Sequence, residues 1–336
     1  AVNLRVLSLN ILADGLATGD APGITGTVLE PARFINDEFA AGVALLDDEA
    51  VDPGFSFALR CPADALEWQR RWPMLLAMIL EQEPDIIGLQ EIDLAPGDKN
   101  GPNSNPAHHE EIRHDLEQAG YDGEFACKKG RACDGVAVFW RRSRLQVAGA
   151  SKVLGLGSVF VALAQPLILD SKWNLLAVAT HLKAGLNQQA EKVRAQQVES
   201  LLWQLWEHKN VILLADLNAH CRPWLDDKSE EVRPHAYPLL AAELWSAYHA
   251  VLGHEPPFTS WSGWAGRDVR AVFDYVFFRG DILSATRVLD IPSSADVLEF
   301  PERMPNANHP SDHLPMVVDF SIKTSKEAAA KRQRQW

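Results

Sequence analysis

The hydrophobic pattern of the chain is mostly that of β-strands. Apolar and polar residues alternate over residues 4–9 (LRVLSL), as in a strand with one buried face. Short apolar runs with polar residues at their ends predict further strands over residues 85–90, 135–140, 145–147, 159–169, 173–180, 211–214, 272–278 and 315–320.

Helical periodicity is expected over residues 62–82, 112–119 and 188–208. The third segment has the clearest apolar stripe, which is made of Val198, Leu201, Leu202 and Leu205. Pro73 predicts a kink in the first helix, because proline removes a backbone donor. Strands dominate and the helices fall between them. This order favours an α/β fold with two packed sheets and helices outside them over a regular βαβ repeat.

We expect one domain over residues 1–322, followed by a basic tail over residues 323–336. Residues 18–58 are rich in Gly, Pro, Asp and Ala and have weak periodicity, which indicates an insertion or surface excursion. No internal repeat, G-x-G-x-x-G motif or Walker loop occurs in the sequence. We expect a monomer.

Charge and composition limit which binding partners and cellular compartments we expect for the protein. The formal net charge of −13 argues against long-range attraction to nucleic-acid backbone or an anionic membrane. No run approaches eighteen consecutive apolar residues, so we expect no membrane span. The cysteines (Cys61, Cys127, Cys133 and Cys221) fit neither a disulfide framework nor a zinc module. Reduced thiols predict an intracellular, cytoplasmic protein, although a Cys127–Cys133 disulfide and an organellar location remain alternatives.

Six strand segments have an acid, amide or imidazole near one end. These residues are Asn10, Glu91, His181, Asp216 with Asn218, Asp274, and Asp312 with His313. Taken singly, each is most simply a turn former, a helix cap or an ordinary histidine. Because strands of packed sheets bring distant positions to one rim, we expect the six segments to build one site.

The residue types at this rim suit metal-assisted hydrolysis of a phosphate ester. Glu91, Asn10 and Asp312 are hard oxygen ligands for Mg²⁺, with Mn²⁺ as a substitute. Asp216 would orient or deprotonate a water, and Asn218 and His181 would donate to phosphate oxygens. His313 would act as acid or base, with Asp274 holding its tautomer.

Several short motifs occur in a characteristic order: LNIL (9–12), LQEID (89–93), THLKA (180–184), ADLNA (215–219), FDYVF (273–277) and SDHLP (311–315). Together they resemble the endonuclease/exonuclease/phosphatase superfamily. CPADALEWQRR (61–71), CDGVAVFW (133–140) and PPFTSW (256–261) are similar to its nocturnin-like and deadenylase branch. The resemblance implies a four-layer, DNase I-like α/β sandwich with one divalent-metal site, and the residue roles given above.

The branch implies adenine-containing substrates. A 3′–5′ exoribonuclease acting on an RNA 3′ end is the first expectation, and a 2′-phosphatase of NADP(H) the alternative. Lys128, Lys183 and Arg270 match substrate-contacting positions, whereas Gly185 stands where nocturnin carries an arginine. Three loop tryptophans, Trp224, Trp261 and Trp264, could stack an adenine, with Trp261 as the candidate for substrate binding, although most tryptophans are core residues.

Two other classes of function remain as alternatives. One is a lipid or cyclic-nucleotide phosphodiesterase, which would want an apolar or strongly basic loop that the sequence does not display. The other is a scaffold that has lost its chemistry. Glu91, His181, Asp216 and His313 argue against the scaffold, since a protein that only binds has no need of all four.

Overall fold

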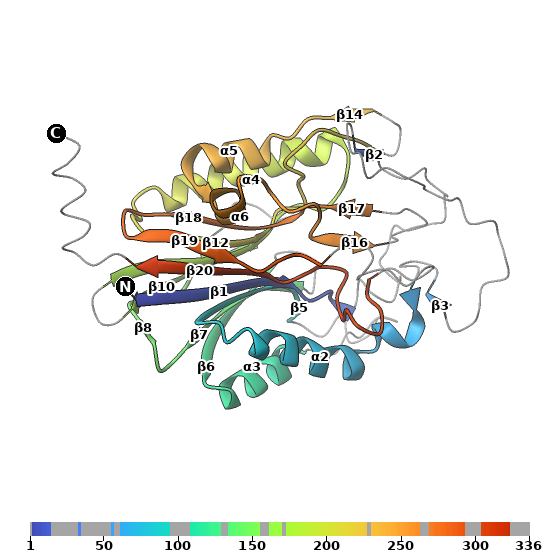
Figure 1. Ribbon diagram of the computed structural model, residues 1–336. Helices are drawn as coiled ribbons and strands as arrows, with labels where there is room; N and C mark the ends of the chain where they lie inside the picture. Colours follow the sequence, from blue (N-terminus) through green and yellow to red (C-terminus); the bar gives the residue numbers. More distant parts are fainter. Residues whose placement is uncertain are drawn as a thin grey trace.

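Two mixed β-sheets pack face to face, with helices on their outer faces (Figure 1). A computed structural model of the chain describes residues 2–14, 33–34, 55–56, 61–94, 108–128, 134–154, 161–169, 173–226, 230–262, 269–292 and 304–322. The expected four-layer α/β sandwich is confirmed. Most of the 18–58 segment, the tail, Cys133 and Trp264 lie outside the described residues.

The first sheet has the strand order β19-β20-β1-β5-β7-β6. Its strands are β1 (Val2–Asn10), β5 (Ile86–Asp93), β6 (Tyr121–Cys127), β7 (Asp134–Arg141), β19 (Leu283–Val288) and β20 (Met316–Ile322). Only β1 and β5 run parallel, and the other neighbours are antiparallel. The start of β20 therefore lies beside the end of β1.

The second sheet has the order β15-β18-β12-β11-β10-β8, and β9 also pairs with β10. Its strands are β8 (Leu145–Val147), β9 (Lys152–Leu154), β10 (Val161–Leu169), β11 (Trp173–His181), β12 (Val211–Asp216), β15 (Trp245–Ser246) and β18 (Asp274–Arg279). Here β11 and β12 are the parallel pair, and β18 is antiparallel to β12. The start of β18 therefore lies beside the end of β12.

Helices cover the two outer faces of this sandwich. On the first sheet lie α2 (Trp68–Glu81), preceded by the 3-10 turn η1 (Ala63–Leu66), and α3 (His109–Gln118); on the second lie α4 (Gln188–Leu205) and α5 (Ala236–Glu243) (Figure 1). The short α6 (Ala247–Leu252) contacts β18 and β19. Among the described residues, none of the helices is long and apolar enough to cross a membrane.

The alternation at the start of the chain explains how β1 is packed. Leu4 and Val6 belong to the core between the two sheets, whereas Leu7 and Leu9 belong to the core under α2 and α3. A strand with apolar residues on both faces must be covered on both, which fits an inner layer of a sandwich. At Gly88 in β5 the sheets come so close that an added Cβ would lie 2.6 Å from the Cβ of Leu214.

The sequence did not predict β6, β19 or α5, and two of the expected elements are interrupted or begin later than expected. The helix expected over residues 62–82 is interrupted at Glu67, which is extended, and α2 then continues through Pro73. The strand expected over residues 272–278 begins only at Asp274. The reason is local: the backbone N–H groups of Phe273 and Asp274 donate to the Thr259 hydroxyl, at 2.9 and 3.0 Å.

Short strands flank the sheets. β2 (Arg33–Phe34) and β14 (Glu231–Val232) pair with β13 (Trp224–Leu225), and β16 (Ser260–Ser262) pairs with β17 (Val269–Ala271). β3 (Phe55–Ser56) pairs with β4 (Cys61–Pro62). The described part of the 18–58 segment is thus tied to the chain through two-residue strands and adds no strand to either main sheet.

Candidate active site

The candidate site residues meet where one edge of the first sheet lies next to the corresponding edge of the second. The first sheet contributes the ends of β1 and β5 and the segment before β20; the second contributes the ends of β11 and β12 and the start of β18. Contacts join the rims directly. Asn10 Nδ2 donates to Asp216 Oδ2 at 2.8 Å, and His313 Nδ1 lies 2.8 Å from Asp274 Oδ2.

Backbone strain accompanies this convergence. Leu12, Glu91 and Asn218 have φ angles of 59°, 58° and 49°, in the left-handed region that side chains other than glycine rarely occupy. Glu91 sits at a register shift between β5 and β7, which re-aims a side chain that the regular pleat would direct elsewhere. Such strain persists where surrounding contacts fix it, and it gathers at functional sites.

Glu91, His181 and Asp216 form one group whose candidate ligand atoms lie within 4.8 Å of one another. His181 Nε2 is 3.8 Å from Glu91 Oε1 and 3.6 Å from Asp216 Oδ2. The Glu91 carboxylate is 12 % exposed and its Oε2 accepts a bond from Ala13 N at 3.2 Å. In the described part of the chain, neither carboxylate forms a salt bridge with lysine or arginine, and two such oriented carboxylates suit a hard divalent cation.

Asp216 is fully enclosed and held by hydrogen bonds to its charged form. Its Oδ1 accepts from Asn218 N at 2.9 Å, in addition to the bond from Asn10 on Oδ2. Burial raises the pKa of Asp216, but the neighbouring His181 ring, the charge of His313 and these hydrogen bonds outweigh burial and lower it. The side chain is therefore an ionised acceptor in the site.

His313 and Asp274 form a buried pair. Burial lowers the pKa of His313, but the carboxylates of Asp274 and Asp312 outweigh it and hold that pKa well above the usual imidazole value. Asp274 Oδ2 also accepts from the Thr259 hydroxyl at 2.7 Å, which fixes the carboxylate. His313 is thus an imidazolium that donates Nδ1–H to Asp274 and presents Nε2–H.

A second set of contacts, which the sequence analysis missed, surrounds His181. Lys128 Nζ lies 3.0 Å from His181 Nδ1 and 2.5 Å from Asp134 Oδ2. Burial raises the pKa of Asp134, but the neighbouring His181 ring, whose Nδ1 lies 3.7 Å from Asp134 Oδ2, and the charge of Lys128 lower it to about 2. Asp134 opens β7 much as Asp274 opens β18, and that position at the start of a strand was the signal available in the sequence.

The two remaining expected metal ligands have other contacts. Asn10 Oδ1 accepts from Leu12 N at 2.9 Å, while its amide nitrogen faces Asp216. Asp312 Oδ1 lies 3.9 Å from His313 Nε2. Both residues lie at the rim, and their roles as metal ligands stay predictions.

The model of the endonuclease/exonuclease/phosphatase family matches residues 69–313, which is 245 of 336 residues and runs from α2 to His313. The chain belongs to this family. Its branch is nocturnin-like: nocturnin of Rattus norvegicus is 29% identical over 296 residues, covering 82% of this chain and 63% of the nocturnin. Human nocturnin is 28% identical over 303 residues, and the match covers 82% of this chain and 63% of the human protein.

The chain thus spans about 63% of the length of these curated relatives. Solved structures share the fold of this chain. The human nocturnin catalytic domain with bound sulfate aligns with a TM-score of 0.63 at 23% identity, covering 96% of this chain and 94% of that one. ANGEL2, described as a 2′,3′-cyclic phosphatase, aligns with a TM-score of 0.64 at 18% identity and covers 95% of each chain.

The basic residues expected to contact substrate are placed differently within this family fold. Lys128 is at the site beside His181. Lys183 is exposed in the loop after β11, and its backbone N–H donates to Gln197 Oε1 at 3.0 Å. The Arg270 guanidinium lies 4.9 Å from the centre of the Trp261 ring.

The tryptophans expected to stack a base are largely enclosed. Trp261 is 4% exposed and packs on Phe258, so stacking on its ring face would require Arg270 to leave it. Trp224 is 1% exposed, and its Nε1 donates to Leu186 O at 2.7 Å. Trp224 is therefore a core residue, which was the alternative to a role in stacking a base.

Gly185 lies in the loop that follows His181, and the contacts of this loop fix its backbone conformation. Gly185 has a φ of +123°, and Arg194 Nη1 donates to both Lys183 O and Gly185 O, at 2.8 and 2.7 Å. Arg194 itself is fully buried and paired with Glu191. Position 185, where the nocturnin-like branch carries an arginine, therefore has a backbone conformation that favours glycine.

Proposed function

We propose that this chain is a divalent-metal-dependent phosphohydrolase that attacks a phosphate ester with water. The observation that carries the proposal is the junction of the two rims. An ionised Asp216 and an imidazolium at His313, backed by Asp274, lie beside a carboxylate-rich group that includes Glu91. Separate acid and base groups of this kind are what general acid–base hydrolysis needs.

Glu91 is proposed as the principal metal ligand, assisted by Asn10 and Asp312. A bound divalent cation such as Mg²⁺, with Mn²⁺ as substitute, supplies charge neutralisation at the phosphate and a lower pKa for a coordinated water. The donor set is oxygen-rich, as Mg²⁺ prefers. We expect His181 Nε2, which lies beside Glu91 and Asp216, to contact a phosphate oxygen.

Two side chains, Asp216 and His313, carry out the proton transfers of the proposed reaction. Asp216 accepts a hydrogen bond from the attacking water and takes its proton, since Asn10 and Asn218 hold both carboxylate oxygens in place. His181 and the Asn218 amide donate to non-bridging phosphate oxygens. His313 donates Nε2–H to the leaving oxygen, and Asp274 stabilises the imidazolium.

We propose adenine-containing substrates, with the 3′ end of RNA first. This choice rests on the motifs shared with deadenylases, and it is supported by an ANGEL2 structure that holds adenosine-2′,3′-vanadate. A second candidate is the 2′-phosphate of NADP(H), favoured by two observations. Nocturnins are among the curated relatives, and a net charge of −13 disfavours affinity that depends on many phosphates.

The test presents the purified chain with Mg²⁺, end-labelled oligo(A) and NADPH in parallel. Hydrolysis should be abolished by a chelator and fall at least about a hundredfold in Glu91→Gln. Glu124→Gln, which changes an exposed glutamate of β6, is the matched control and should retain full activity. Activity that survives both the chelator and Glu91→Gln would contradict the metal mechanism. A shortened RNA ladder selects the nuclease, and phosphate release from NADPH selects the phosphatase.

A further inference from the structure

Arg71 on α2 is a buried guanidinium whose donors are directed at backbone carbonyls from separate segments. Its side chain is 1% exposed. Nη1 donates to Ile11 O at 2.7 Å, Nη2 to Leu12 O at 2.9 Å, and Nε to Leu66 O at 3.1 Å. A cation this deeply buried is costly unless its hydrogen bonds and charge are satisfied, so these contacts define its role.

The carbonyls that Arg71 holds belong to the loop from which the site is assembled. That loop follows Asn10, which bonds Asp216, and includes Ala13, whose N–H bonds Glu91. Leu12, at the point of contact, has the strained φ of 59°. Arg71 thus donates hydrogen bonds to two carbonyls of this loop at the point where the backbone conformation is strained.

The segment before β20 is tied to the same loop. Ser311 Oγ donates to Asn10 O at 2.7 Å, and Arg71 Nη1 lies 3.5 Å from Pro310 O. Asp312 and His313 follow directly in the chain. Arg71 therefore lies behind the junction of the segments that carry Asn10 and His313.

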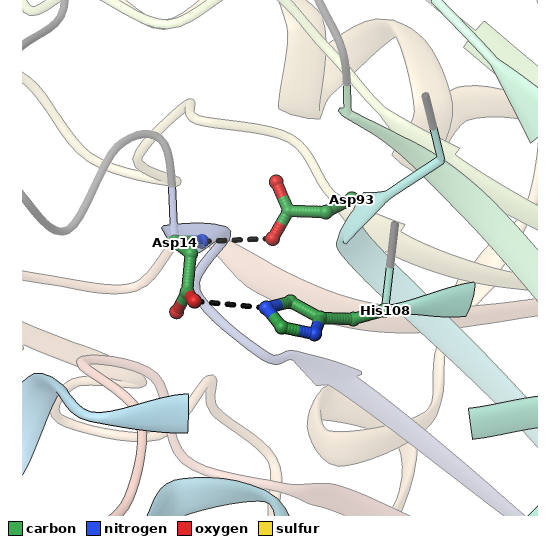
Figure 2. A group of neighbouring side chains, drawn as sticks. All are labelled: Asp14, Asp93 and His108. Atoms are coloured by element: carbon green, nitrogen blue, oxygen red, sulfur yellow. Dashed lines mark hydrogen bonds and ion pairs between the residues drawn. The ribbon is translucent and has the colours of Figure 1, made fainter. Parts of the chain in front are cut away.

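The counter-charge of Arg71 is supplied by Asp14, which also contacts Asp93 and His108 (Figure 2). Asp14 Oδ1 accepts from Arg71 Nη2 at 2.7 Å, and its Oδ2 is 2.8 Å from His108 Nε2. The Asp14 N–H donates to Asp93 Oδ2 at 2.9 Å. His108 stacks on Trp68, with ring centroids 4.0 Å apart.

We infer that Arg71, with Asp14 as its counter-ion, is a positioning residue that holds the metal-binding rim in shape from behind. The inference rests on the proposed function in one respect, because the metal that the rim would hold belongs to that proposal. Asp14, Asp93 and His108 also have the spacing of a metal site. Both oxygens of Asp14 already have partners, Arg71 and His108, so we assign the group to the support of Arg71.

The experiment compares Arg71→Lys with Arg5→Lys in the full chain. Arg5 is a matched control. It also joins β1 to α2 and β20, through Gln82 O at 2.8 Å and Asp319 at 2.6 and 3.1 Å, but at the start of β1, away from the site. Lysine keeps the charge and loses the planar fork of donors. Asp14→Asn serves as a second variant if Arg71→Lys does not fold.

Two readouts that do not depend on activity are measured. Calorimetric affinity for Mn²⁺ should fall about tenfold or more in Arg71→Lys, the size expected for residues that orient metal ligands. Amide hydrogen exchange at Leu12 and Ala13 should become at least about tenfold faster, because their partners Asn10 Oδ1 and Glu91 Oε2 lose their alignment. Asp14→Asn should change both in the same direction, and Arg5→Lys should change neither.

The inference is overturned if Arg71→Lys or Asp14→Asn lowers the melting temperature while Mn²⁺ affinity and amide exchange stay at wild-type values. It is also overturned if the wild type binds two Mn²⁺ and Asp14→Asn removes one, since the group would then be a metal site. Failure of the proposed function looks different. The wild type would hydrolyse neither substrate, and the exchange comparison would still decide the role of Arg71.

Discussion

Lys128 Nζ lies 3.0 Å from Nδ1 of His181, the last residue of β11. An ammonium group has donors only, so Nδ1 must accept and the ring proton must sit on Nε2. That nitrogen faces Glu91 and Asp216. The lysine therefore sets His181 as a hydrogen-bond donor toward the site, whatever further contact it makes with substrate.

Replacing Lys128 with Met should release this constraint. We expect kcat to fall about tenfold or more, because His181 then populates the tautomer with no proton on Nε2. Nitrogen NMR of the imidazole should show Nδ1 unprotonated in the wild type and a mixture in Lys128→Met. The control is Lys152→Met, which removes an exposed lysine of β9. An unchanged tautomer in Lys128→Met would contradict the assignment.

Asp134 should make folding depend on pH in the acid range. Its folded pKa of about 2 lies below the ordinary value of 3.8, so its stabilising contribution is present above pH 4 and lost as pH falls toward 2. Asp134→Asn should lower the free energy of unfolding by about 2 kcal/mol at pH 7. Urea unfolding at several pH values measures this, and the difference between variant and wild type should vanish near pH 2.

Asp274→Asn should move the alkaline limb of the activity profile. The charge of Asp274 helps to hold the pKa of His313 above its ordinary value, and activity is lost as pH rises through that pKa. Without the carboxylate the pKa falls, and the limb should shift to lower pH by more than about one unit. The profile of kcat/KM against pH measures this. A limb that stays in place would exclude His313 as the acid.

Gly185 allows a test of substrate choice. With a φ of +123°, both Gly185→Ala and Gly185→Arg should cost about 1–3 kcal/mol of stability, and the added Cβ would lie 3.1 Å from Ala190 Cβ. Only the arginine variant supplies a guanidinium that can bind phosphate. We therefore expect a KM for NADPH about tenfold lower in Gly185→Arg than in Gly185→Ala. Equal KM values would show that this position does not contact the substrate phosphate.

The sequence by itself determined most of the framework. Alternation in β1 and the apolar runs that ended in polar residues located most strands of the two sheets, since burial on a sheet face has a period of two. They did not locate β6 and β19, whose sequences contain no such run. The strand-end residues Asn10, Glu91, His181 and Asp216 could be gathered into one site for the same reason. Each lies at a strand end, and sheet packing aligns such ends.

Only the tertiary structure decided how these residues are held and charged. The partners of the site are far apart in the chain: Asn10 and Asp216 are separated by 206 positions, and Asn10 and Ser311 by 301. No local period encodes such pairs. Arg71 reads as one residue of an amphipathic helix, and Trp224 as one tryptophan of eleven. Their burial and hydrogen bonds depend on contacts between segments that are far apart in the sequence. The same contacts determine the direction of each pKa shift.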